Sequence, residues 1–125
     1  MHFLTLIYID PERMAELPAE DYDRLMLGCF EKADALRDAG CLHASQQLQD
    51  PGSARTLRVR DGVARITDGP FAETREFLAG FNLIEAVDID AAMQIASAFP
   101  WSRFGSIEVR PVRDMQAVRH QVGAD

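Results

Sequence analysis

Two segments of the chain have the composition of β-strands that are covered on both faces. Residues 3–9 read FLTLIYI and residues 77–86 read FLAGFNLIEA, with apolar side chains at both odd and even positions. Side chains of a strand alternate between the two faces of its sheet. Strands of this composition are shielded from water on both sides, so a fold that contains them needs cover on each face of the sheet.

Two further segments have the apolar periodicity of helices. Residues 19–39 predict a long helix that ends with Gly40 as its C-terminal cap. Its apolar stripe recurs at steps of three and four residues and consists of Tyr22, Leu25, Met26, Cys29, Phe30, Ala33 and Leu36. Residues 89–99 predict a second helix, with Asp88 as its N-cap and Pro100 as its end. The predicted core face of this second helix consists of Met93 and Ala96, with Phe99 or Ile95.

Residues 55–67 predict a β-hairpin. Asp61-Gly62 between two alternating segments is typical of a two-residue type I′ turn, which places Arg58 opposite Arg65. One face of the hairpin is then apolar, with Leu57, Val59, Ala64 and Ile66, and the other face carries Arg58, Arg60 and Arg65. Like charges directly opposite each other destabilise a sheet, so the two facing arginines either splay into water or share an anionic partner.

The order of the predicted elements indicates one domain with an α+β fold. Strands are also expected over residues 42–48 and 106–112, which gives β-α-β, the hairpin, then β-α-β. This is the split βαβ or ferredoxin-like arrangement, βαββαβ, with the hairpin as an insertion. The domain is expected to cover residues 1–113. Residues 114–125 form a polar tail with room for a short helix. Because two helices cover only one face of the sheet, we expect a homodimer in which a second copy covers the other face.

Charge and hydropathy exclude several classes of partner. The formal net charge is −7, which disfavours non-specific binding to nucleic acid or to an anionic membrane surface. No apolar run approaches the roughly 18 residues that span a bilayer. The first residues have neither the basic region nor the cleavage site of a signal peptide. A cytoplasmic protein is therefore expected.

The cysteines and histidines predict neither a metal site nor a cofactor. Cys29 and Cys41 are twelve residues apart, which matches no zinc or redox motif, and we expect two free thiols in a reducing compartment. No set of histidine, cysteine and carboxylate residues has metal-ligand spacing along the chain. The sequence also has no glycine-rich phosphate loop and no nucleophile elbow.

Three motifs resemble a known family. They are TLRVRDG at residues 56–62, DGPFAETRE at residues 68–76 and GSIEVRP at residues 105–111. With them the chain is similar to the DGPF-domain proteins of the YCII-related superfamily. The resemblance implies a bacterial, dimeric α/β-barrel built on a ferredoxin-like fold, with an active-site cleft on the sheet. Most members have no assigned function, and many are encoded beside, or fused to, sigma factors of the extracytoplasmic-function type.

The resemblance does not carry over a catalytic dyad. The better-studied YCII-like proteins have a histidine early in the first helix, paired with an aspartate. The histidines of this chain are His2, His43 and His120, and none of them lies within residues 19–39. His43 falls in a predicted strand, where a packing or surface role is more common than a role as a base.

The charged segment that leads into the strand at residue 77 supplies candidate site residues. Asp68 could cap a turn at the amide of Phe71, pair with an arginine, or handle a proton. Glu73 and Glu76 are either solvated or fold back onto Arg58 or Arg65 of the hairpin. Such a cluster is a structural ion-pair network or a substrate site.

Glu108 and Arg110 extend this set. They alternate with Ile107 and Val109 on the last strand, so they are expected to face away from the helices, toward a cleft on the dimer side. In such a cleft Asp68 and Glu108 are the candidate catalytic residues. The candidate ligand-binding residues are Arg58, Arg65, Glu73 and Arg110, and an interface ion-pair network is the alternative.

Two functional hypotheses follow. The first is a homodimeric small-molecule binding protein, or an acid/base enzyme without a cofactor, that takes a small anionic ligand. The second, which rests on the resemblance, is a regulatory partner of a sigma factor. Trp101 and Phe104 follow the second helix and would either wall the pocket or, as the preferred interpretation, anchor the dimer.

Overall fold

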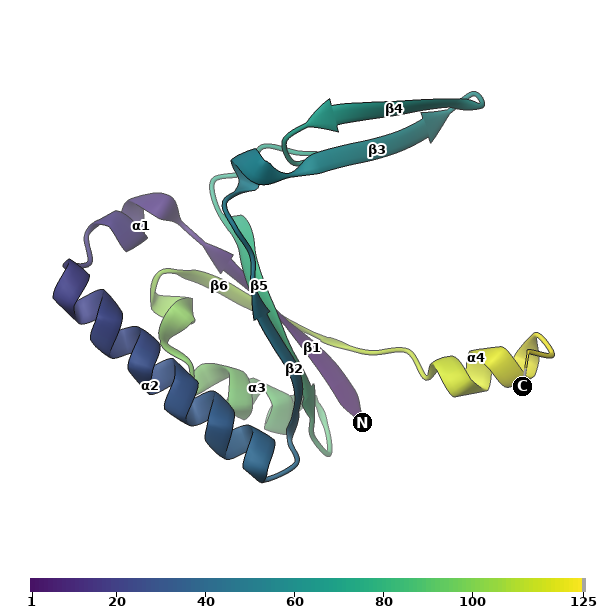
Figure 1. Ribbon diagram of the computed structural model, residues 1–125. Helices are drawn as coiled ribbons and strands as arrows, with labels where there is room; N and C mark the ends of the chain where they lie inside the picture. Colours follow the sequence, from purple (N-terminus) through teal and green to yellow (C-terminus); the bar gives the residue numbers. More distant parts are fainter. Residues whose placement is uncertain (125) are drawn as a thin grey trace.

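The strands with two apolar faces lie at the centre of a four-stranded antiparallel sheet. The computed structural model describes residues 1–124, and the order of strands in this sheet is β2-β5-β1-β6 (Figure 1). These strands are β1 (His2–Ile9), β2 (Leu42–Gln47), β5 (Phe77–Glu85) and β6 (Gly105–Pro111). When the hairpin is left out and the strands are numbered along the chain, their order across the sheet is 2-3-1-4. This order is compatible with the predicted ferredoxin-like α+β fold.

Within the described residues, four α-helices accompany the sheet. They are α1 (Pro11–Ala15), α2 (Ala19–Asp38), α3 (Ile89–Ser97) and α4 (Met115–Gln121). Helices α2 and α3 lie on the same face of the sheet (Figure 1), as predicted for the two longest helical segments. No helix within residues 1–124 combines the length and the apolar composition needed to cross a membrane.

Strand β1 shows why both sheet faces are apolar. Its odd-numbered residues, from Phe3 to Ile9, are buried against the side that carries the helices. Its even-numbered residues Leu4, Leu6 and Tyr8 lie on the opposite face, which no helix within residues 1–124 covers, and are only half-buried. We call this second surface the open face. On it the side chains of β5 continue the apolar surface, with Leu78, Phe81 and Leu83.

Helix α3 packs closely on the sheet through small residues. Ala92 and Ala96 are buried, while Met93 is exposed, so the predicted core position of Met93 is wrong. Residues 92 and 96 are four apart and lie on one side of the helix, where their short side chains let its backbone approach the strands. Asp88 caps the helix as predicted, since its carboxylate accepts a hydrogen bond of 2.8 Å from the amide of Ala91.

Helix α2 packs less closely. Among the residues of its predicted apolar stripe only Cys29 is buried, and Phe30 is 56% exposed. The helix ends as expected, because Gly40 has φ of +78° and the amide of Cys41 donates to the carbonyl of Leu36. The helix therefore covers the sheet, but most side chains of its apolar stripe are not buried in the core.

The predicted hairpin forms a separate two-stranded sheet. Strands β3 (Arg55–Arg60) and β4 (Val63–Asp68) pair with Arg58 opposite Arg65, in the predicted register. Asp61 and Gly62 both have positive φ, as a type I′ turn requires. The hairpin and α4 extend from the body away from α2 and α3 (Figure 1). Both elements expose apolar side chains, which are Leu57, Val59, Val63 and Ile66 in the hairpin and Met115 and Val122 in or beside α4.

The start of β6 predicts a strong sensitivity to a single methyl group. A Cβ atom on Gly105 would lie 1.9 Å from the carbonyl oxygen of Tyr8, inside backbone atoms that cannot move aside. We expect Gly105→Ala to lower the free energy of unfolding by at least about 2 kcal/mol, measured by urea denaturation at fixed protein concentration. The matched control is Gly28→Ala, at a position in α2 with no atom within 4 Å of the new Cβ. That variant should raise the free energy of unfolding by about 1 kcal/mol, and equal effects of the two changes would contradict this account.

Candidate functional site

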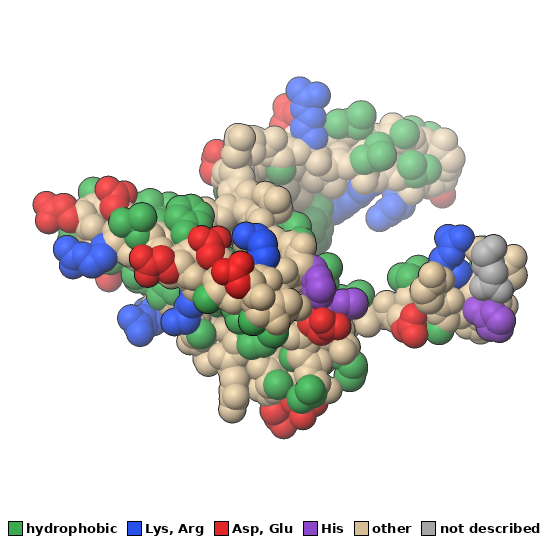
Figure 2. Space-filling model, turned by 60° about the horizontal axis from the view of Figure 1, so that its bottom comes forward, with side chains coloured by type: hydrophobic (Ala, Val, Ile, Leu, Met, Phe, Trp, Pro, Cys, Tyr) green, Lys and Arg blue, Asp and Glu red, His purple; other side chains and the backbone are tan. Residues whose placement is uncertain are grey.

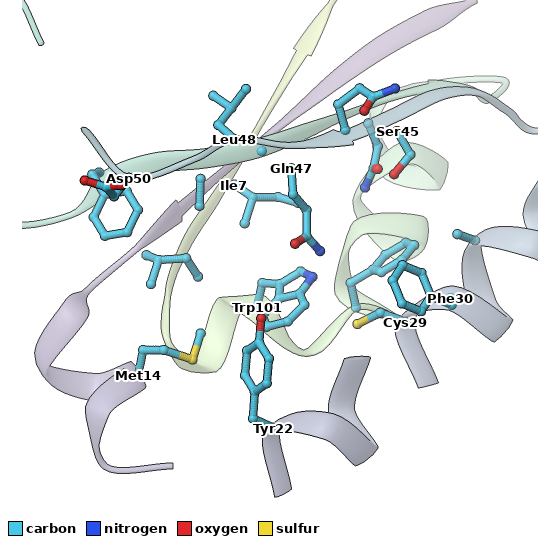
Figure 3. A pocket seen from close by; sticks show the side chains of 18 residues that line it. Ile7, Met14, Tyr22, Cys29, Phe30, Ser45, Gln47, Leu48, Asp50 and Trp101 are labelled. Atoms are coloured by element: carbon cyan, nitrogen blue, oxygen red, sulfur yellow. The ribbon is translucent and has the colours of Figure 1, made fainter. Parts of the chain in front are cut away.

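A cavity of about 280 Å³ lies between α2 and the face of the sheet that carries the helices (Figure 3). Strands β1, β2 and β5 form its floor, and Tyr22, Cys29 and Phe30 form the wall on α2. Trp101, in the short turn that follows α3, closes one end. The cavity exists because α2 does not approach the sheet closely, so the space beneath its apolar stripe is not filled.

Most of the cavity wall is apolar, but a row of polar residues crosses its floor. Strand pairing places Ser45 of β2 opposite Asn82 of β5, and Asn82 opposite Thr5 of β1. Ser45 and Asn82 line the cavity, and Asn82 is only 5% exposed. The neighbouring hydroxyl of Thr5 is buried without a hydrogen-bond partner. Polar side chains beneath a helix are normally hydrogen-bonded, so this polar row in an apolar cavity needs an explanation.

Asn82 makes no side-chain hydrogen bond within residues 1–124. Within residues 1–124 the only fully buried side-chain polar atom without a partner is Thr5 Oγ1, so the amide atoms of Asn82 are open to the cavity. Since the amide of Asn82 is reached from the cavity, a molecule in the cavity could supply the missing partner. Gln47 also directs its side-chain amide into the cavity (Figure 3).

The ionisable groups of the cavity are few. Asp50 is the only carboxylate among its lining residues, and these include no histidine. Burial raises the pKa of the Cys29 thiol above its ordinary value of 9.0, and the charge of Lys32 acts in the opposite direction. Cys29 is therefore a protonated thiol at neutral pH and not the thiolate that a nucleophile requires.

The residues predicted from the charged segment lie outside this cavity. Asp68 ends β4 with its side chain 92% exposed and pairs with Arg55 at 3.5 Å, so an arginine partner is the alternative that the structure supports. Arg58 donates a hydrogen bond of 3.2 Å to the carbonyl of Phe71. Arg58, Arg60 and Arg65 together line a second hollow on the basic face of the hairpin, with a volume of about 360 Å³.

The predicted ion pairs between the hairpin arginines and Glu73 or Glu76 do not form within residues 1–124. Glu76 accepts a hydrogen bond of 2.8 Å from the hydroxyl of Ser106, and Glu73 has no ionic or hydrogen-bond partner in this range. The physical reason is the direction of the chain. The hairpin extends away from the body, while the segment after Pro70 returns to the sheet at β5 (Figure 1).

Glu108 and Arg110 form a second group on the open face. Val109 and Ile107 pack on the helix side, so the prediction that the charged pair faces away from the helices is confirmed. Arg110 Nε lies 2.6 Å from Glu108 Oε2, and this hydrogen bond with the adjacent negative charge raises the pKa of Arg110. Within residues 1–124 no hydrogen bond or ion pair joins this group to Asp68, Arg58 or Arg65.

Comparison with known proteins identifies the family of this chain. The model of the YCII-related domain matches residues 1–116. The chain belongs to the YCII-related family. An uncharacterized protein from Rhizobium meliloti (strain 1021) is 34% identical over 116 residues, which cover 90% of this chain and 92% of the relative. The resemblance carried by DGPFAETRE is therefore confirmed for nearly the whole chain.

The main structural role of the charged segment in this YCII-related protein belongs to Arg75. Its Nε lies 3.2 Å from Oδ2 of Asp10, a residue that is 2% exposed, and its guanidinium also approaches Glu12 at 3.5 Å. The Asp10 carboxylate caps α1 by accepting from the amide of Glu12, and Arg13 lies 3.7 Å away. Helix α1 was not predicted from the sequence, although an aspartate before a proline is typical of a helix start.

Trp101 and Phe104 are located on the helix side of the sheet. Trp101 is buried and lines the cavity, so the preferred interpretation as a dimer anchor is wrong for this residue. Phe104 packs against the same core cluster, and its carbonyl accepts a hydrogen bond of 2.7 Å from the amide of Asp10. The reason is that the turn after α3 brings the aromatic rings back under α2. Their place could not be read from a short loop sequence.

The two aspartates of these networks should differ strongly in their effect on stability. Asp10→Ala removes a helix cap and leaves Arg75 and Arg13 without their buried partner, so we expect a loss of about 2–3 kcal/mol in the free energy of unfolding. Asp68→Ala removes one ion pair on an exposed surface and should change it by less than about 0.5 kcal/mol. Urea denaturation of both variants checks this expectation. A larger loss for Asp68→Ala would place the structural role in the hairpin instead.

Proposed function

We propose that this YCII-related protein is a homodimeric small-molecule binding protein, and that its ligand occupies the cavity between α2 and the sheet. The observation that carries the proposal is the unpaired amide of Asn82 in the floor of an apolar cavity. Binding sites for small molecules are commonly apolar spaces with a few convergent polar groups that fix orientation. Asn82, Ser45 and Gln47 are those groups here.

The size and polarity of the cavity define the class of ligand. A volume of about 280 Å³ lies near the lower end of the range for such sites, so the ligand is small. The apolar walls favour an aromatic or aliphatic body, which Trp101 and Phe99 would contact. The floor favours one group that both donates and accepts hydrogen bonds, as a phenol or a primary amide does, because the side-chain amide of Asn82 offers both functions.

The chemistry of the cavity favours binding over turnover. Acid/base catalysis needs a proton donor and acceptor within hydrogen-bond reach of the reacting atoms. The cavity offers Asp50 and Tyr22 near its rim and a protonated thiol at Cys29, and none of these forms a hydrogen-bonded pair with another. The charged cleft with Asp68 and Glu108 remains a prediction, since only contacts with a second chain would bring these residues together.

Three unpartnered surfaces support the homodimer. The open face carries a row of half-buried apolar residues, the isolated hairpin exposes an apolar face, and α4 has only seven residues. A two-stranded hairpin and a single short helix are both marginal in water without a partner. Figure 2 shows the hairpin and α4 as two arms with open space between them. A second copy placed in that space would cover all three surfaces by one symmetric contact.

The homodimer is tested by the mass of the protein in solution. Sedimentation velocity at micromolar concentration should give twice the chain mass of 14.0 kDa. Ile66→Glu, on the apolar face of the hairpin, should shift the protein toward the monomer because it buries a charge in the contact. Leu27→Glu is the matched control, since Leu27 is similarly exposed but lies on the outer side of α2. A monomeric wild type, or equal dissociation by both variants, would sink the proposal.

Occupancy of the cavity can be measured through the single tryptophan of the chain. A panel of small phenols and amides should contain a compound that changes the fluorescence of Trp101 and raises the melting temperature. Asn82→Leu should weaken that compound at least tenfold, while the ligand-free variant melts at a similar or higher temperature because the change removes no hydrogen bond within residues 1–124. Gln94→Leu, on the exposed side of α3, should leave binding unchanged. Unchanged binding by Asn82→Leu would show that the cavity floor does not recognise the ligand.

The regulatory alternative, in which the protein binds a sigma factor, remains a prediction from the family resemblance alone. The same apolar surfaces that support the homodimer would serve a different protein partner. A wild type that is monomeric alone and that co-purifies with a tagged sigma factor would favour this alternative.

A further inference from the structure

Three side chains with metal-binding atoms meet at one end of the open face. They come from three neighbouring strands, with His2 on β1, Glu85 at the end of β5 and His43 on β2. One ring nitrogen from each histidine and one carboxylate oxygen all lie within 4.8 Å of one another. Nε2 of His43 lies 3.4 Å from Oε2 of Glu85, and Nε2 of His2 lies 3.9 Å from Oε1.

The backbone fixes this arrangement. His2 and Glu85 are directly paired between β1 and β5, and β2 has a register shift between Leu42 and Ala44 that contains His43. The amide of Glu85 donates to the carbonyl of Cys41 at 2.8 Å, and the carbonyl of His2 accepts from Val112 at 2.9 Å. The three side chains therefore start from hydrogen-bonded strands, which hold ligands more rigidly than loops do.

We propose that His2, His43 and Glu85 bind a divalent transition-metal ion, with Zn²⁺ as the reference ion. Bonds of about 2.0–2.1 Å to nitrogen or oxygen give a separation of about 3.4 Å between two ligands of a tetrahedral ion. The distance of His43 from Glu85 already has this value. Nε2 of His2 lies 3.9 Å from the other oxygen, Oε1, and the three ligand atoms lie within 4.8 Å of one another. His2 must therefore move inward by up to about 1.4 Å, and its half-exposed side chain is free to turn.

The choice of ligands indicates the class of metal. Imidazole nitrogen suits zinc, copper, nickel and iron, whereas calcium and magnesium prefer sites made of oxygen alone. Two imidazoles and one carboxylate also leave at least one coordination position open. The two imidazole rings are almost perpendicular, at 83°, and their centroids are 5.0 Å apart. The rings are therefore not stacked face to face, which would leave no room for an ion between their nitrogens.

The site is separate from the cavity, and its test does not depend on the proposed ligand. His2 and Glu85 share the open face with Leu4 and Leu83, whereas the cavity is on the side that carries the helices. Figure 2 shows a purple histidine patch beside acidic side chains, at the edge of the open space between the hairpin and α4. The open coordination position is therefore available to water or to a group from outside the chain.

Cobalt and zinc titrations of the metal-free protein test the proposal. The affinity tag is placed at the C-terminus, because a tag before Met1 would add metal ligands next to His2. The tag is removed before titration. We expect one Co²⁺ per chain with the visible d–d bands of nitrogen and oxygen coordination, displaced by one equivalent of Zn²⁺. His43→Gln and Glu85→Gln should each weaken Zn²⁺ binding at least tenfold in calorimetric titrations, as loss of one of three ligands requires. His2→Gln is a third variant with the same expected loss, at an exposed position where the change leaves the core intact.

Two controls separate this site from adventitious binding. His120→Gln removes the remaining histidine and Cys41→Ser removes the thiol two residues before His43. Both should leave the affinity for Zn²⁺ unchanged. The proposal is overturned if the wild type binds no Zn²⁺ at micromolar concentration, if all three ligand variants bind as the wild type does, or if Cys41→Ser abolishes binding. Circular dichroism of each metal-free variant confirms that it is folded before titration.

Discussion

The fold depends on a central strand that is apolar on both faces. β1 pairs with β5 on one edge and β6 on the other, and its odd-numbered side chains form the core beneath α2 and α3. Its even-numbered side chains lie on the open face, where the chain itself provides no second layer. The residue that follows β1, Asp10, then holds α1 and receives Arg75, so the segment that contains DGPF is positioned from this strand as well. Cover for one sheet face begins with β1, and attachment of the hairpin segment begins with Asp10, the residue that follows it.

The charged segment at residues 68–76 is mainly a set of attachments between distant elements. Gly69 donates its amide to Ala54 at 2.7 Å and accepts from the hydroxyl of Thr56, which closes the base of the hairpin. Arg75 reaches the end of β1, and Glu76 reaches Ser106 at the start of β6. Charged side chains serve such connections well because each bond is directional and tolerates solvent. The density of charge in this connection therefore has a structural explanation that needs no ligand.

Local patterns predicted the elements, and long-range geometry determined the sites. The type I′ turn at Asp61-Gly62, the cap at Asp88 and the order of the elements along the chain follow from residues close together in the chain. The rotation of α3 about its axis does not follow from nearby residues. Ala92 is buried and its neighbour Met93 is exposed, and this difference depends on how closely the helix approaches the sheet. Neither the cavity nor the group of His2, His43 and Glu85 has a sequence signature. The cavity reflects a helix that is not closely packed, and the histidine group reflects the register of three strands.

The stability of the separate hairpin depends on contacts that the hairpin itself does not provide. Its two strands form no ladder with the main sheet, so their opening need not disturb the core, and their apolar face is exposed within one chain. Local opening of such a unit is governed by whatever covers it. With a second copy as the cover, mass action couples the order of the hairpin to the amount of protein present. The basic hollow between its arginines would then exist as an ordered surface only at concentrations where chains meet.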